Sequence, residues 1–152
     1  MNKNTIIFDL DGTLANIDAR RKLATKPNGK LDWDIFFDPS NIKLDVPNEP
    51  VVKIAQMFAE NGYTIIIFSG RSDRTKYSTR SWLSNNRVPF QKLVMRDSNA
   101  SHFVPDEILK KDMLDKHADI DDVFLVVDDR NKVVDMWRSL GLDVFQVADG
   151  DF

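Results

Sequence analysis

Short apolar runs alternate with amphipathic stretches along most of this chain. Strand-like runs, rich in apolar and β-branched residues, occur at 5–9, 64–68, 92–95, 123–127 and 143–147. Between them, apolar residues at helical spacing predict helices at 50–61, 76–86, 105–116 and 131–140. Strands that alternate with helices are typical of βαβ units. The pattern therefore predicts an α/β fold with a five-stranded parallel sheet flanked by helices.

One stretch, from about residue 14 to 48, does not fit this alternation and is too long for a simple loop. Within it, Trp33, Phe36 and Phe37 have the i, i+3, i+4 spacing of a short helix. These aromatic residues either pack the stretch onto the body or stack against a substrate. Because the stretch follows the first strand, we expect residues 16–48 to form a small cap or lid over one edge of the sheet.

Composition sets modest limits on class and location. The chain has 152 residues, 42% of them hydrophobic, which predicts one domain over residues 1–152. It has no cysteine, and no apolar run near its start is long enough for a signal peptide or a membrane span. We therefore expect a cytoplasmic protein that does not contact a membrane. The net charge of −3 argues against nonspecific coating of nucleic acid, but segments 16–30 and 71–87 are basic and suit an anionic substrate.

The most informative motif follows the first strand, where Ile6-Ile7-Phe8 leads into Asp9-Leu10-Asp11-Gly12-Thr13. Two carboxylates separated by one residue at a strand end are expected to reach the same edge of the sheet. They repel each other unless a cation lies between them or one is protonated. Gly12 permits a sharp turn that brings N–H groups near an anion, and Thr13 adds a hydroxyl donor. The motif suggests metal-assisted phosphoryl transfer.

Polar residues also follow other strands. Ser69-Gly70-Arg71 follows the second, where a hydroxyl, a glycine and a guanidinium can hold a phosphate. Asp128-Asp129 follows the fourth, although Asp129 could instead cap the next helix. Parallel strands end at one edge, so these groups are expected to meet there.

Oxygen ligands at this edge suit Mg²⁺ better than Zn²⁺. The expected ligands are Asp9, the backbone carbonyl of Asp11, and Asp128 with Asp129, completed by phosphate and water. His102 and His117 are isolated and are predicted to be surface or capping residues. The helix from Pro105 leaves Lys110 or Lys111 near the same edge.

In order and position, these residues resemble the four motifs of the haloacid dehalogenase (HAD) superfamily of phosphohydrolases, which have a Rossmann-like fold. The chain is more similar still to the 3′-phosphatase domains of bacteriophage polynucleotide kinase/phosphatases. The matching segments are Asp9-Leu10-Asp11-Gly12-Thr13-Leu14-Ala15, Ser69-Gly70-Arg71, Thr79-Arg80-Ser81-Trp82, Val94-Met95-Arg96, Asp128-Asp129-Arg130, Met136-Trp137-Arg138 and residues 146–152.

The resemblance implies a role for each matched residue. It places the nucleophile on Asp9, the acid/base on Asp11 and the lysine on Lys110. Phosphate-binding groups fall on Thr13, Ser69 and Gly70, and the substrate arginines on Arg20 and Arg71.

No G-x-x-x-x-G-K-[ST] loop occurs in this sequence, so we expect no kinase domain in it. The resemblance implies an Mg²⁺-dependent phosphatase that acts through an aspartyl-phosphate and removes the 3′ phosphate from polynucleotide ends. Free nucleotides or other small phosphate esters are an alternative substrate class, and a non-catalytic binding domain is a more distant alternative.

Overall fold

A five-stranded parallel sheet forms the centre of the computed structural model, which describes residues 2–99 and 103–152. The strands are β1 (Thr5–Phe8), β4 (Thr64–Ser72), β5 (Lys92–Arg96), β6 (Val123–Asp128) and β7 (Val144–Gln146). Their order is β5-β4-β1-β6-β7, with every neighbouring pair parallel. The predicted fold class is confirmed. The strand bounds differ from the prediction in several places. β1 ends at Phe8, and β4 continues past Phe68 to Ser72. β5 and β6 each run one residue further than predicted, and β7 is shorter by one residue at each end.

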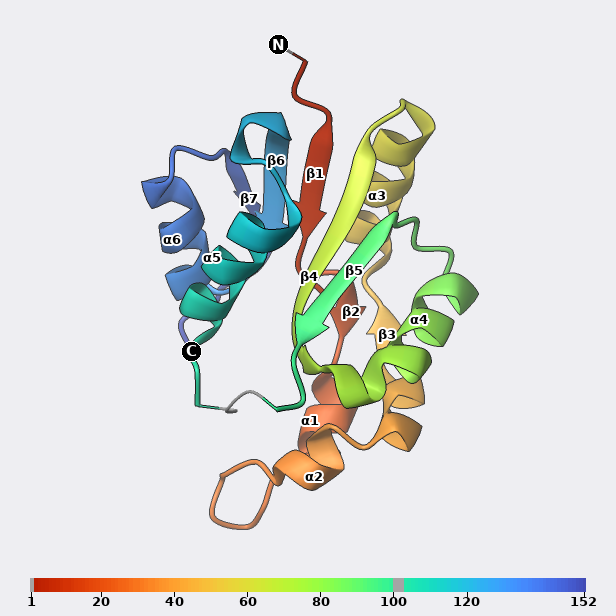
Figure 1. The fold of residues 1–152 in the computed structure, drawn as a ribbon. Coiled ribbons are helices and arrows are strands. Elements are labelled where there is room, and N and C mark those ends of the chain that lie inside the picture. The colour runs from red at the N-terminus through yellow and green to blue at the C-terminus, as the bar shows by residue number, and fades with distance from the viewer. Residues whose placement is uncertain (1, 100–102) are drawn as a thin grey trace.

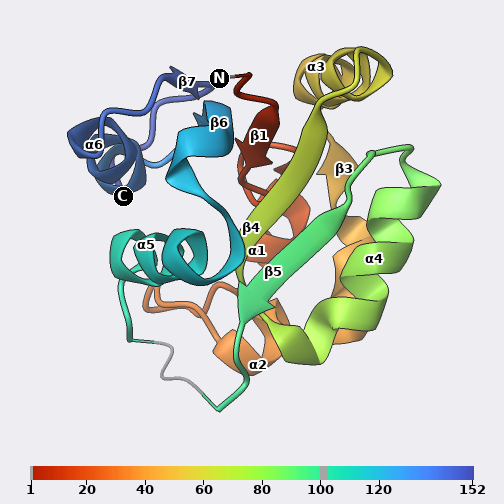
Figure 2. The ribbon, with the colours of Figure 1, turned by 45° about the horizontal axis from the view of Figure 1, so that its top comes forward.

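Helices cover both faces of the sheet (Figures 1 and 2). The helices α3 (Glu49–Glu60) and α4 (Lys76–Asn85) lie on one side, and α5 (Asp106–His117) and α6 (Asn131–Ser139) lie on the other. Strand alternation assigns residues to these two layers. Ile6 and Phe8 pack in the core that includes α3 and α4, whereas Ile7 packs with Met113 of α5 and Trp137 of α6.

The stretch predicted as a cap is an insert between β1 and α3. Its ends are joined by the antiparallel pair β2 (Ala15–Asn16) and β3 (Val46–Pro47). Between them lie α1 (Asp18–Ala24), α2 (Trp33–Phe36) and the 3₁₀ helix η1 (Pro39–Leu44). The predicted short aromatic helix is α2, whereas α1 was not predicted. Figure 1 shows α1 and α2 beyond the end toward which β1, β4 and β5 point, which is where an active-site cover would lie. A lid function for the insert stays a prediction.

Two short 3₁₀ helices, η2 (Asp73–Thr75) and η3 (Ile120–Asp122), complete the fold. His117 is exposed at the end of α5, as predicted, and His102 lies outside the described residues. In the two described ranges, no helix has both the length and the apolar character needed to cross a membrane.

Candidate active site

A cavity of about 560 Å³ lies where the strands β1 and β6 end, between the insert and the first half of α5. Asp9 and Asp11 line it from the turn after β1, and Asp128 and Asp129 line it from the end of β6. Lys110 reaches it from α5. Parallel strands therefore bring together at one edge the carboxylates that the sequence separates by more than a hundred residues.

Asp9 is held on both of its carboxylate oxygens. Lys110 Nζ donates to Oδ1 at 2.7 Å, and the Thr13 hydroxyl donates to Oδ2 at 2.9 Å. The same ammonium donates to Asp128 Oδ2 at 3.1 Å. The sequence left Lys110 and Lys111 as alternatives. Lys110 is the buried one, because Lys111 points outward and pairs with Asp115.

Burial raises the pKa of Asp9 well above its usual range. The Lys110 ammonium opposes this shift, while the Asp128 and Asp129 carboxylates add to it. Burial alone would lower the pKa of Lys110, but Asp128 and Asp9 outweigh burial and raise it, so Lys110 carries a positive charge. The three carboxylates repel one another even with the Lys110 ammonium beside them, so a further cation bound here would stabilise them.

The donor set fits a hard divalent cation. One oxygen from each of Asp9, Asp128 and Asp129 lies within 4.8 Å of the others, and all three residues are buried. Oxygen-only donors in this arrangement are typical of Mg²⁺ sites. Asp128 is oriented by two further donors, the Asp129 backbone N–H at 2.9 Å and Trp137 Nε1 at 3.2 Å. The assignment of the direct ligand between Asp128 and Asp129 stays open.

Asp129 contacts the turn after β1 rather than capping α6. The Thr13 hydroxyl lies 3.3 Å from Asp129 Oδ1, and the residue before α6, Arg130, makes no side-chain cap. Gly12 has φ +84°, and a Cβ atom there would overlap the Asp129 carboxylate. Glycine is therefore required at this position both for its backbone conformation and for the approach of Asp129.

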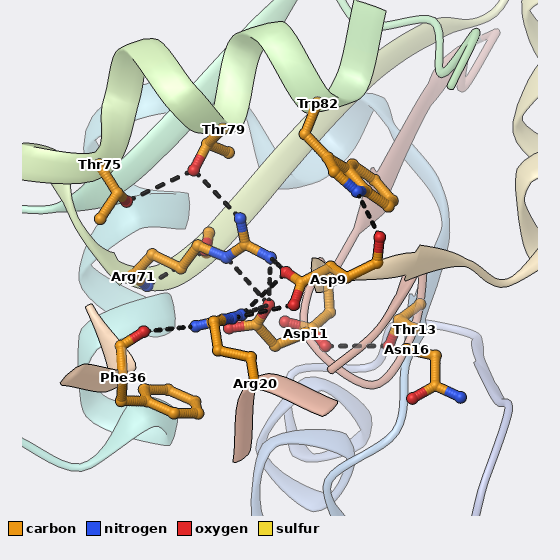
Figure 3. Close-up of polar contacts among 12 residues, drawn as sticks. Asp9, Asp11, Thr13, Asn16, Arg20, Phe36, Arg71, Thr75, Thr79 and Trp82 are labelled. Atoms are coloured by element: carbon orange, nitrogen blue, oxygen red, sulfur yellow. Dashed lines mark hydrogen bonds and ion pairs between the residues drawn. The ribbon is translucent and has the colours of Figure 1, made fainter. Parts of the chain in front are cut away.

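Asp11 has different partners from Asp9, since the chain leaves the strand after Phe8 and side chains no longer alternate. Arg71 donates to Asp11 Oδ1 through Nε at 2.9 Å and Nη2 at 2.6 Å, and Arg20 Nη2 donates to the same oxygen at 3.0 Å (Figure 3). Burial would raise the pKa of Asp11, but Arg71 and Arg20 outweigh it and hold the pKa below the usual value.

Both arginines are fully buried and fully engaged, and neither is among the residues that line the cavity. Arg20 also donates to the Phe36 carbonyl at 2.9 Å, and Arg71 Nη1 donates to the Thr79 hydroxyl at 3.1 Å (Figure 3). In this arrangement Arg20 and Arg71 act on Asp11. Direct contact of either one with substrate stays a prediction.

A second carboxylate behind the site, Asp45, was not identified from the sequence. Its side chain is fully buried and accepts from Arg20 Nε at 2.9 Å, Arg20 Nη2 at 3.1 Å and Arg71 Nη2 at 2.7 Å. Trp82 Nε1 of α4 donates to the Asp45 backbone carbonyl at 2.9 Å and fixes the end of η1. Trp82 lies in one of the segments that carry the resemblance, but nothing in the sequence links it to Asp45.

A separate ion network, also not identified from the sequence, borders the cavity on the β5 side. Asp106, at the start of α5, accepts from Arg96 Nη2 at 3.0 Å and from Arg130 Nη1 at 3.2 Å. Arg96 Nε also donates to the Gly70 carbonyl at 3.1 Å. Gly70 lines the cavity, and a Cβ there would lie 2.8 Å from an Asp106 oxygen. Ser69 is buried beside it, with its hydroxyl accepting from the Arg71 backbone N–H at 3.1 Å.

Comparison with known families gives a match over nearly the whole chain. The family model for the phosphatase domain of polynucleotide kinase PNKP matches residues 3–152.

Solved structures agree with this match. A chain in a Pnkp1/Rnl/Hen1 complex is 32% identical with a TM-score of 0.80, covering 99% of this chain and 48% of that one. A chain in a structure of the Pnkp1/Rnl/Hen1 RNA repair complex is 33% identical with a TM-score of 0.80, over 98% of this chain and 44% of that one. The present chain therefore spans less than half the length of these two relatives.

A more distant structure shares the fold. It is an HAD family enzyme from Bacteroides thetaiotaomicron in complex with magnesium and inorganic phosphate. It is 16% identical with a TM-score of 0.57, over 98% of this chain and 96% of that one.

Proposed function

This chain belongs to the PNKP phosphatase-domain family, and on that premise we propose that it is an Mg²⁺-dependent phosphomonoesterase that removes the 3′ phosphate from a nucleic-acid end. One observation carries the proposal: the carboxylate of Asp9 is fixed at the cavity floor between Lys110 and Thr13, beside Asp128 and Asp129. Because these side chains surround one point, we assign Asp9 as the nucleophile, Lys110 as a cation beside it and the three carboxylates as the metal-binding set.

Asp9 forms the new bond. Its carboxylate attacks phosphorus in line, and the ester oxygen leaves, so that the phosphoryl group is carried on Asp9 as an acyl phosphate. The Lys110 ammonium and the Thr13 hydroxyl hold the nucleophile in place and offset the charge that develops on the phosphoryl oxygens. Mg²⁺ bound by Asp9, Asp128 and Asp129 would supply further neutralisation of that charge.

Asp11 transfers the protons. All three arginine contacts fall on Oδ1, so Oδ2 is the oxygen that gives a proton to the leaving group. In the second step Oδ2 takes a proton from the water that attacks phosphorus, so that inorganic phosphate leaves and the Asp9 carboxylate is regenerated. Arg71 and Arg20 keep the Asp11 pKa low, which suits the second step. The first step requires that a bound phosphate weaken those contacts, so that Asp11 can carry a proton.

Two observations support the assignment of a nucleic-acid end as substrate: the relatives of this chain and the cationic side chains at the cavity. A related chain belongs to the Pnkp1/Rnl/Hen1 RNA repair complex, which favours an RNA end over a DNA end. The bound magnesium and phosphate of the distant HAD enzyme support the metal assignment by fold. Cationic side chains at the cavity, among them Arg21, Arg130 and Lys132, suit a polyanionic strand.

A substrate panel tests the proposal. It compares kcat/KM for RNA and DNA oligonucleotides with a 3′ phosphate, the same oligonucleotides with a 5′ phosphate, and nucleoside 3′- and 5′-monophosphates. We expect the 3′-phosphorylated oligonucleotides to be hydrolysed best, with activity that falls steeply as salt rises through loss of phosphate contacts. Preference for mononucleotides, with a shallow salt dependence, would replace the polynucleotide assignment with the small-ester alternative.

A further inference from the structure

One wall of the active-site cavity is apolar, and the proposed phosphoryl chemistry does not use it. The insert supplies this wall through Leu31, Trp33, Phe36 and Phe37, which line the same cavity as Asp9. Ligand cavities in proteins combine an apolar wall with a few polar groups that fix orientation. Here the carboxylates lie at the strand ends, and the insert adds the rings of Trp33, Phe36 and Phe37.

The Trp33 ring is fixed in place by contacts with the rings of Phe36 and Phe37. It stacks on Phe37 with centroids 5.6 Å apart and an interplanar angle of 18°, and it meets Phe36 edge-on at 5.7 Å. Phe36 and Phe37 are only 6% exposed, whereas Trp33 is 43% exposed. The two phenylalanines therefore pack the insert onto the body, while Trp33 presents ring surface at the cavity.

Positive charge lies along the rim of the same cavity. Arg21 lies on α1, and Arg130 lies just before α6, where it also pairs with Asp106. Their guanidinium carbons lie 5.7 Å and 5.3 Å from the centroid of the Phe152 ring. The cavity therefore has three parts that match the 3′ end of a nucleic-acid strand. The carboxylate cluster around Asp9 suits the terminal phosphate, the rings of the insert suit the base, and the two arginines suit the next phosphodiester. Sites that bind single strands combine stacking rings with cations in this way.

We propose that Trp33 stacks against the base of the 3′-terminal nucleoside while the 3′ phosphate lies at Asp9. The inference rests on the proposed function and adds which part of the substrate the insert contacts. The base is one sugar ring away from the phosphate, so a phosphate on the floor brings the base to the adjoining wall. Because every base has a π face, this contact distinguishes an end that carries a base from an abasic end, with little choice among bases.

The test uses two 3′-phosphorylated oligonucleotides that differ only in the last nucleotide, which carries either a normal base or a stable abasic sugar. The measured quantity is the ratio of kcat/KM for the base-bearing end to that for the abasic end. We expect wild type to favour the base-bearing end and Trp33→Ala to lower the ratio about tenfold. Trp33→Phe, which keeps a ring, should retain most of the preference.

Tyr77→Ala is the matched control. Tyr77 is an aromatic residue of α4 that is 85% exposed and is not among the cavity-lining residues, so its removal should leave the ratio at the wild-type value. The melting temperature of each variant separates a packing role from a binding role. If Trp33→Ala lowers the melting temperature and reduces both rates equally, Trp33 only packs the insert and the inference is wrong.

The same assay distinguishes failure of the Trp33 stacking inference from failure of the proposed function. Hydrolysis of both ends by wild type with equal kcat/KM, or a ratio unchanged in Trp33→Ala, overturns the stacking inference and leaves the phosphatase proposal in place. If wild type hydrolyses neither oligonucleotide but hydrolyses small phosphate esters, the nucleic-acid substrate is wrong and the stacking inference falls with it.

Discussion

Replacement of Asp45 by alanine tests how the two buried arginines of the site are held. The fully buried Asp45 carboxylate accepts three N–H groups, two from Arg20 at 2.9 and 3.1 Å and one from Arg71 at 2.7 Å. In Asp45→Ala both guanidinium groups remain buried, and Asp11 is the one carboxylate left among their described partners. Two buried positive charges then share one negative charge.

Loss of one partner from a buried ion pair costs about 3–5 kcal/mol, because an uncompensated charge stays buried. For a chain of this size, each kcal/mol shifts the melting temperature by about 2–4 °C, which predicts a fall of about 6–20 °C. Asp45→Asn keeps the side-chain shape and one acceptor oxygen, so its loss should be smaller. Asp34→Ala is the control on the same insert, since Asp34 is exposed and its removal should change stability by less than about 0.5 kcal/mol.

The assay is urea unfolding of wild type and the three variants, with the free energy of unfolding compared at equal m-values. A second readout is kcat/KM on the best substrate, which should fall in Asp45→Ala because Arg20 and Arg71 also orient Asp11. If Asp45→Ala costs less than about 1 kcal/mol, as an exposed pair would, the buried carboxylate does not hold the arginines and this reasoning is wrong.

Three further predictions concern the metal site, Asp11 and Gly12. EDTA should abolish activity and Mg²⁺ should restore it, while the larger Ca²⁺ should not, and full activity in EDTA would contradict the metal assignment. In Mg²⁺ titrations of activity, Asp128→Ala should raise the Mg²⁺ concentration required for half-maximal activity more than Asp129→Ala does. Asp11→Asn should retain turnover of an activated aryl phosphate, whose leaving group needs little protonation, and lose turnover of 3′-phosphorylated ends; equal losses would exclude the acid role. Gly12→Ala should lower the unfolding free energy by more than Gly29→Ala, because both glycines have positive φ but only at Gly12 would a Cβ meet the Asp129 carboxylate. Equal losses would show that the close contact between Asp129 and the turn does not require glycine.

The sheet and its edge were predictable because their signals are local. Each strand is a short apolar run, and parallel strands end at one edge, so Asp9, Asp128 and Asp129 were expected to meet before any contact was known. The structure brings them within 4.8 Å. The choice between Lys110 and Lys111 needed the structure, since the two lysines are adjacent on α5 and only their side-chain directions separate them.

The first helix of the insert and the ion pairs beneath it were less predictable, because they have no apolar pattern. Helix α1 buries Arg20 and Ala24 rather than an apolar stripe, so hydrophobic periodicity gives no signal there. Asp45 lies 25 residues from Arg20 and 26 from Arg71 in sequence, and only the folded insert brings the three together. For the same reason, Asp106 and its partners Arg96 and Arg130 had no local pattern that could identify their network.

The central claim is that Asp9 takes the phosphoryl group from a 3′ end. The most direct measurement mixes wild-type enzyme and Mg²⁺ with an oligonucleotide radiolabelled in its 3′ phosphate, quenches in acid within milliseconds, and maps the labelled peptide. The account predicts a labelled peptide that contains Asp9, no labelled protein from Asp9→Asn, and little label from the matching 5′-phosphorylated oligonucleotide. Label retained in Asp9→Asn, or phosphate release from the 3′ end without any labelled protein, would contradict it.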